Sequence, residues 1–163
     1  MAIIKIVGKD DPILRKTSRR VDEITPRIIK LLEDMKDTLR DAEGAGLAAV
    51  QVGVLRRIVL VETEPGELIE MINPEIIETE GVQENLEGCL SVPDVWGITS
   101  RPAKVTVRAQ NRKGEYFTVS GTGLKARAFC HELDHLDGKL FTDCSIKLMS
   151  TEEMQKMMDK KKN

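Results

Sequence analysis

The sequence predicts an α+β fold in which a mainly antiparallel β-sheet packs around a central helix, with further helices towards the N-terminus and the C-terminus. Three observations indicate this class. Apolar residues recur at helical spacing in residues 26–41 and 123–137, and a capping-box pattern begins at Ser150. Short β-branched runs fill the middle of the chain, between the two helices. Strands that are grouped in this way, rather than alternating with helices, favour antiparallel pairing.

The first helix is predicted over residues 26–41. Thr25 suits an N-cap, and Pro26 falls at the first helical position, where a backbone N–H is not needed. One face of this helix is then apolar, with Ile28, Leu32, Met35 and Leu39. The Gly-containing segment 43–46 is expected to end it.

The middle of the chain is predicted to form strands. Short β-branched runs lie at residues 57–62, 68–73 and 75–79, with Pro74 separating the last two. Residues 105–109 alternate between apolar and polar, as a half-buried strand does. A turn over residues 111–114 then leads to a return strand over residues 116–120, which predicts a hairpin.

The central helix is predicted over residues 123–137, with Gly138 as its stop. Residues from about 150 to 163 are expected to form a C-terminal helix or tail. The capping-box pattern Ser150-Thr151-Glu152-Glu153 begins it, and a methionine stripe follows that is typical of a packing face. A chain of 163 residues suits one domain, so we expect a single catalytic domain over residues 1–163.

Composition excludes several classes of function. The net charge is −2, from 25 basic and 27 acidic residues, so no direct nucleic-acid readout is expected. The three cysteines form no CxxC pair, which indicates a reducing compartment rather than a disulfide framework. The first ten residues do not resemble a signal peptide, and no apolar run is as long as a membrane span. We therefore expect a cytoplasmic protein without a membrane partner.

The segment His131-Glu132-Leu133-Asp134-His135 lies within the predicted central helix and forms a candidate metal site. Histidines four residues apart place both imidazoles on one face of a helix, where they can share one divalent metal. Glu132 can reach a metal-bound water without binding the metal, and can act as general base and acid. Both histidines of the chain are found here. The predicted central helix is therefore a metal-binding helix, and the chain a metallohydrolase.

A catalytic site of this kind needs a third protein ligand and an open position for water. No histidine follows His135. The acidic and thiol candidates downstream are Asp143, Cys144, Glu152 and Glu153. Upstream, Cys89 stands beside Gly88, which permits close backbone approach, and its thiolate suits a mid-row divalent metal.

Three segments together resemble the motifs of the peptide deformylase family, and they occur in the family's order. These are Gly44-Ala45-Gly46-Leu47-Ala48-Ala49-Val50-Gln51, then Glu87-Gly88-Cys89-Leu90-Ser91, then His131-Glu132-Leu133-Asp134-His135. The similarity extends from Asp11 to Phe141. The family removes the formyl group from the N-terminal formyl-methionine of new bacterial or organellar proteins, so the resemblance implies a role in N-terminal processing during protein biosynthesis.

The resemblance implies a metal ligand set of Cys89, His131 and His135. It implies that Glu132 is the general base and acid. Two donors would stabilise the developing oxyanion, namely the side chain of Gln51 and the backbone N–H of Leu90.

The resemblance also implies where the substrate lies. Gly46 would let the substrate's backbone approach closely, and Leu124 and Ala128 would line an apolar pocket for the methionine side chain. Arg101 would pair with Glu87 and support the loop that carries Cys89.

The implied cofactor is ferrous iron, with zinc, nickel or cobalt as substitutes. The implied partners are N-formylmethionyl peptides of nascent chains, and the resemblance is compatible with ribosome association. Two residues depart from the family pattern. Val50 stands where the family usually has Pro, and Cys130 stands where it usually has Gln.

Two alternatives remain at this point. A zinc endopeptidase would cleave internal peptide bonds without requiring a formyl group, and Cys89 as third ligand argues against it. A structural metal-binding domain would have four protein ligands and would not need Glu132. Cys130 or Cys144 on the metal would favour that second alternative.

Overall fold

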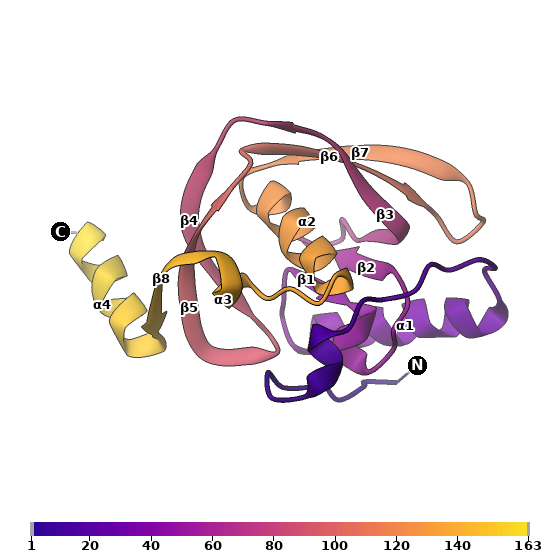
Figure 1. The fold of residues 1–163 in the computed structure, drawn as a ribbon, viewed down its shortest axis with the longest axis horizontal. Helices are drawn as coiled ribbons and strands as arrows, with labels where there is room; N and C mark the ends of the chain where they lie inside the picture. The colour runs from indigo at the N-terminus through magenta and orange to yellow at the C-terminus, as the bar shows by residue number, and fades with distance from the viewer. Residues whose placement is uncertain (1, 163) are drawn as a thin grey trace.

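The computed structural model describes residues 2–162 and confirms the predicted α+β class (Figure 1). Helix α2 (Gly123–Leu136) runs through the middle of the molecule. It packs against strands of both antiparallel sheets, including β1 (Gly46–Ala48), β5 (Val92–Arg101) and β7 (Tyr116–Thr122). The two sheets therefore meet around the one helix that carries both histidines.

The larger sheet has the strand order β1-β2-β3-β6-β7. Besides β1 and β7 it contains β2 (Ile58–Val61), β3 (Ile69–Glu80) and β6 (Lys104–Gln110). The predicted hairpin is confirmed, because β6 and β7 pair from Lys104↔Thr122 to Gln110↔Tyr116. Asn111 closes the turn by accepting hydrogen bonds from the backbone N–H groups of Lys113 and Glu115.

The prediction of two strands separated by Pro74 was wrong, because β3 continues through this proline. The register against β6 shifts between Ile72 and Glu75, which is a β-bulge. Such a bulge tolerates proline, which has no N–H for the ladder. Asn73 adopts φ +52°, and its amide bonds both the N–H and the C=O of Val21. Tertiary hydrogen bonds thus hold a bend that the sequence pattern suggested was a strand end.

The smaller sheet was not predicted. It has the order β4-β5-β8, with β4 (Gln83–Cys89) and β8 (Ser145–Ser150) on either side of β5. The β4–β5 hairpin shifts its register between Glu87 and Cys89, immediately before its turn. Cys89 therefore lies next to the turn of a bulged hairpin, and its side chain points towards α2.

The predicted helices are confirmed. Helix α1 (Pro26–Asp41) is capped by Thr25, whose hydroxyl accepts from the N–H of Ile28, and its four predicted apolar residues are buried. Helix α2 is followed by Gly138 at φ +73°. Helix α4 (Thr151–Lys162) has the predicted capping box, with Ser150 and Glu153 bonding each other's backbone N–H.

Three short helical segments complete the described part of the chain: η1 (Pro12–Arg15), η2 (Ala49–Val52) and α3 (Phe141–Cys144). The core has two parts. One surrounds α2, and the other lies between α1 and the larger sheet, with Leu32 and Ile58 fully buried. Within residues 2–162, no helix is long and apolar enough to cross a membrane.

Candidate metal centre

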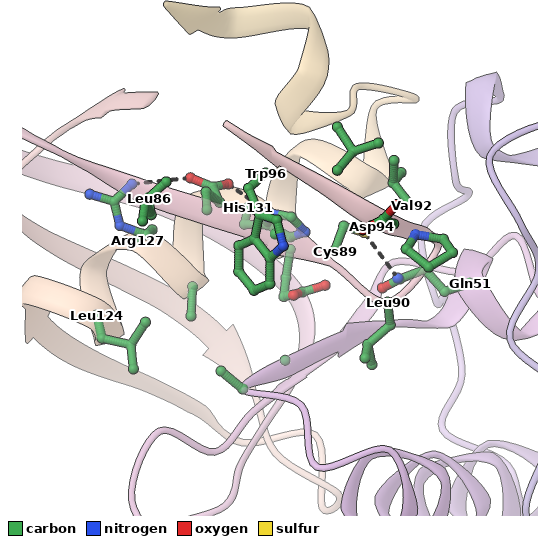
Figure 2. Close-up of a pocket in the computed structure, with 18 residues that line it drawn as sticks. Gln51, Leu86, Cys89, Leu90, Val92, Asp94, Trp96, Leu124, Arg127 and His131 are labelled. Carbon is green, nitrogen blue, oxygen red and sulfur yellow. Dashed lines mark hydrogen bonds and ion pairs between the residues drawn. The ribbon is translucent and has the colours of Figure 1, made fainter. Parts of the chain in front are cut away.

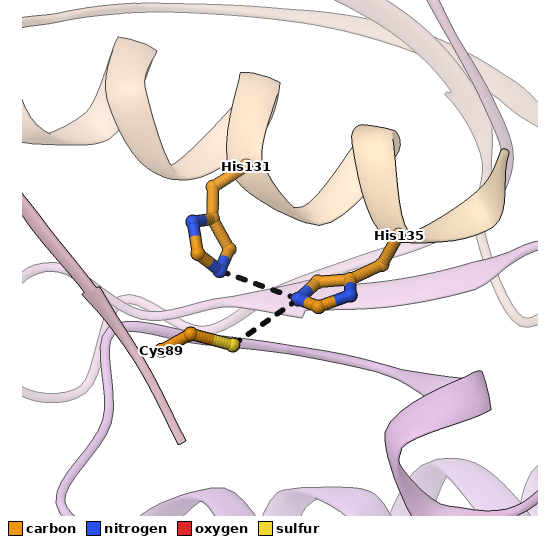
Figure 3. A group of neighbouring side chains, drawn as sticks. All are labelled: Cys89, His131 and His135. Carbon is orange, nitrogen blue, oxygen red and sulfur yellow. Dashed lines mark hydrogen bonds between the residues drawn. The ribbon is translucent and has the colours of Figure 1, made fainter. Parts of the chain in front are cut away.

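The side chains of Cys89, His131 and His135 converge on one point (Figure 3). Cys89 comes from the end of β4, and the two histidines come from successive turns of α2. His135 Nε2 lies 3.3 Å from His131 Nε2 and 3.4 Å from the Cys89 Sγ. Their ligand atoms all lie within 4.8 Å of one another. One sulfur and two ring nitrogens thus face a common centre, as ligands of a single divalent metal do.

The electrostatics of this cluster suit a cation. Burial and the proximity of His131 lower the pKa of His135 to about 3, so its ring is a neutral potential ligand. Burial opposes charge on His131, but Glu132, Cys89 and Glu87 outweigh it and raise the pKa of His131 well above its usual value. The surrounding anionic groups therefore favour positive charge at the centre, and a divalent metal provides it.

Glu87 fixes the orientation of His131. Its Oε1 lies 2.5 Å from His131 Nδ1, which leaves Nε2 directed at the centre. Arg101 donates to both Glu87 oxygens, at 2.7 and 3.2 Å, which confirms the expected pair. Burial alone would raise the pKa of Glu87, but the hydrogen bonds from His131 and Arg101 hold it well below the usual range. Glu87 is therefore a carboxylate that keeps the His131 Nδ1 proton in place.

Glu132 lies beside the centre and is not one of the three converging ligands. It is only 4% exposed, and burial raises the pKa of its carboxyl to about 7. Its Oε1 is buried without a hydrogen-bond partner among residues 2–162. Gly46 faces it so closely that a Cβ there would lie 2.5 Å from Glu132 Oε2. Such a carboxyl, near its midpoint at neutral pH, can accept and return a proton.

Gln51 lies on η2 and is fully buried. Its Oε1 accepts from the N–H of Ala48 at 2.9 Å, so the amide orientation is fixed. Its Nε2 donates to Ser91 Oγ at 3.1 Å and lies 3.6 Å from Cys89 Sγ. Leu90 follows Cys89 directly, so its backbone N–H is one residue from the thiol. Both expected oxyanion donors thus come from elements next to the centre.

A cavity of about 430 Å³ opens onto the centre (Figure 2). It is lined by Gly46, Leu124 and Ala128, as expected, with Leu124 57% exposed. Arg127 and Trp96 also line it, beside the expected apolar residues. Arg127 was not among the predicted site residues, although a charged residue one turn before His131 on the predicted metal-binding helix could have indicated it.

The downstream ligand candidates lie elsewhere. Asp143 pairs with Arg15 at 2.6 Å, and Cys144 is exposed on α3. Cys130 is buried on α2, directly before the proposed ligand His131. Burial raises the pKa of its thiol to about 11, so it is a neutral packed group. Among the residues that the structure describes, the metal-ligating cluster contains neither of these thiols.

Comparison with known proteins gives a consistent result. The family model described as polypeptide deformylase matches residues 3–151. A peptide deformylase of Caldicellulosiruptor bescii is 52% identical over 155 residues, which is 95% of this chain and 93% of that relative. A peptide deformylase of Acetivibrio thermocellus is 52% identical over 162 residues, which is 99% of this chain and 95% of that relative. The crystal structure of a peptide deformylase from Legionella pneumophila superposes with a TM-score of 0.85 at 40% identity, covering 98% of this chain and 92% of that one.

Proposed function

This chain belongs to the polypeptide deformylase family, a metal-dependent enzyme family that removes the formyl group from a polypeptide N-terminus, and on this premise we propose how its residues carry out that reaction. The zinc endopeptidase and the non-catalytic metal-binding domain are not favoured, since relatives about half identical are named as this enzyme.

Cys89, His131 and His135 hold the metal. The convergence of their Sγ and Nε2 atoms within 4.8 Å carries this assignment, and three ligands leave a position for water. When bound, a divalent metal supplies Lewis acidity, which lowers the pKa of water towards about 7 and polarises a carbonyl. Glu87 and Arg101 keep the His131 ring aligned.

Glu132 acts as general base and then as general acid. Its carboxylate removes a proton from the attacking water, and its carboxylic acid returns that proton to the amine that leaves. The free Oε1 and the pKa near 7 support both roles, because the group can exist in either state at neutral pH.

Gln51 and the Leu90 N–H stabilise charge that develops on the formyl oxygen. Ala48 and Ser91 fix the orientation of the Gln51 amide, so its Nε2 is held beside Cys89 Sγ and the proposed metal position. The substrate backbone lies along Gly46. Its methionine side chain enters the cavity between Leu124 and Ala128, where apolar surface is buried.

The native metal is proposed to be ferrous iron, with zinc, nickel or cobalt as substitutes, since imidazole and thiolate donors suit this range of metals. The substrates are N-formylmethionyl peptides of nascent chains, which supports ribosome association and a cytoplasmic site of action. Three free cysteines fit a reducing compartment. We propose that residues 1–163 act as a single catalytic domain.

The direct test is kinetic. The protein is purified without oxygen, loaded with iron or nickel, and given a formyl-Met peptide or the matched acetyl-Met peptide. We expect formate from the first and no deacylation of the second. Absence of formate release would overturn the proposal, and cleavage of an internal bond in a longer peptide would favour the endopeptidase.

A further inference from the structure

Arg127 is a second cation of the metal-site network, and the reaction proposed above does not use it. It lies on α2, one turn before His131, and is only 4% exposed. Its guanidinium faces β4 and β5 rather than solvent. Figure 2 shows Arg127 and His131 among the residues that line the pocket.

The hydrogen bonds of Arg127 tie α2 to the hairpin that carries Cys89. Its Nη1 donates to Thr99 Oγ1 at 2.6 Å, to the Asn85 backbone oxygen at 3.2 Å and to Glu87 Oε2 at 3.3 Å. Its Nη2 donates to Gln83 Oε1 at 3.0 Å. Three of these acceptors belong to β4, so one side chain spans the distance between the cysteine-bearing strand and the histidine-bearing helix.

Thr99 makes the link to Glu87 directional. Its hydroxyl lies 2.6 Å from Glu87 Oε2. A guanidinium can only donate, so Thr99 must accept from Arg127 and direct its own proton to Glu87. Glu87 in turn bonds His131 Nδ1. The sequence of contacts from Arg127 through Thr99 and Glu87 thus ends on a proposed metal ligand.

Charge balance gives Arg127 a second role in this network. Arg101 is shared by two carboxylates, because it bonds Glu87 and also donates to Asp134 Oδ2 at 2.7 Å. Without Arg127 the two acids would share one arginine, and Glu87 would otherwise bond only the Thr99 hydroxyl and the His131 ring. Arg127 restores the balance at Glu87, and a buried carboxylate requires such pairing.

We propose that Arg127 is a positioning residue that sets the placement of Cys89 relative to His131 and His135 and holds Glu87 on the His131 ring. This inference rests on the proposed ligand set. Loss of Arg127 leaves all three ligands in the chain but loosens their common geometry. Removing a partner that orients a ligand typically lowers metal affinity about 10–100-fold.

The test compares Arg127→Met, Arg127→Lys and a matched control, Arg112→Met. Arg112 is a paired arginine far from the centre, bonded to Glu33 and Glu70. For each protein we would measure zinc affinity by chelator competition, the visible spectrum of the cobalt form, and the melting temperature of the metal-free protein.

We expect Arg127→Met to bind zinc about 10–100-fold more weakly, with altered cobalt d–d and thiolate charge-transfer bands. Arg127→Lys, which keeps the charge but not the fork of donors, should recover only part of the affinity. Arg112→Met should keep wild-type affinity and spectrum, whatever it does to the melting temperature. Wild-type affinity and spectrum in Arg127→Met would overturn the inference.

Two further outcomes are distinguishable. If Arg127→Met does not fold, Arg127→Lys decides, because it keeps the charge but loses the fork of donors that reaches Thr99, Glu87 and Gln83 together. A wild-type zinc affinity and cobalt spectrum in that variant would overturn the inference. If wild-type protein and Cys89→Ala bind zinc equally, the proposed ligand set itself is wrong, and this failure does not depend on Arg127.

Discussion

Gly46→Ala displaces the proposed base, Glu132, without changing any metal ligand or titratable group, and a clash with the substrate backbone, which is proposed to lie along Gly46, would appear in KM. An alanine Cβ at this position would lie 2.5 Å from Glu132 Oε2, 2.8 Å from its Cγ and 2.9 Å from its Cδ. Ordinary contact begins at 3.4 Å, so the carboxylate must retreat by about 0.9 Å. Glu132 is buried on α2 and also lines the cavity, so a retreat would move its carboxylate away from its present place beside the centre.

A displacement of about 1 Å in a catalytic group can reduce the rate about 100-fold, which corresponds to about 2.7 kcal/mol in the activation barrier. We therefore expect kcat for formate release to fall by about this factor in Gly46→Ala. Metal content should stay at the wild-type level, because Glu132 is not a ligand. The assay couples formate to a dehydrogenase and is paired with metal analysis of the same sample.

The matched control is Gly8→Ala, since no heavy atom lies within 4 Å of a Cβ at Gly8. It should leave kcat unchanged. A wild-type kcat in Gly46→Ala would refute the argument, because the reacting geometry would then tolerate a displaced Glu132. Loss of metal in Gly46→Ala would also refute it, because the substitution would then disturb the ligands and not Glu132 alone.

Three further predictions concern the general base, the oxyanion donor and the stability of the fold at low pH. Glu132→Gln should keep its metal and lose nearly all formate release, and residual activity near wild type would exclude the general-base role. Gln51→Leu should lower kcat about 10²–10³-fold, with KM changed much less, as loss of one oxyanion donor does. Arg40 donates a hydrogen bond to Glu62 and lowers the pKa of that carboxyl. The pair therefore stabilises the fold at pH values above the usual carboxyl pKa of about 4.3. This stabilisation is lost as the pH falls from that value through the lowered pKa of Glu62. In urea denaturation, Glu62→Gln should be less stable than wild type at neutral pH, and the two should converge in acid.

Sequence patterns predicted the elements whose residues repeat at a clear period. Helix α1 has its apolar stripe and Thr25 cap, the β6–β7 hairpin has its alternation and turn, and Gly138 ends the segment after α2. These features are local, so neighbouring residues alone encode them. The same holds for the capping box at Ser150.

The smaller sheet was not predictable in the same way. Strand β4 carries mostly polar residues and a glycine, and its partly exposed and exposed positions do not alternate with buried ones, so no period of two appears. Its stability depends on tertiary bonds, such as those from Arg127 and Arg101 to Glu87. Asn73 likewise holds the bulge in β3 through Val21, which is 52 residues away. Distant contacts of this kind leave no local pattern.

The residues of the candidate site also differ in whether local sequence predicts them or only distant contacts reveal them. The spacing of His131 and His135 follows from helix geometry, so two ligands could be inferred directly. Cys89 lies 42 residues before His131, and the residues alone left it as one of several candidates. The resemblance to a family singled it out. Arg127 and Thr99 belong to no motif, and their role became visible only through the distances that join them.

The central claim is that one sulfur and two imidazole nitrogens bind the metal. X-ray absorption of the zinc-loaded protein tests it most directly. We predict one sulfur neighbour at about 2.3 Å and two nitrogen neighbours at about 2.0–2.1 Å, with the sulfur absent in Cys89→Ala. A spectrum without sulfur, or one with two sulfurs from Cys130 or Cys144, would contradict the account.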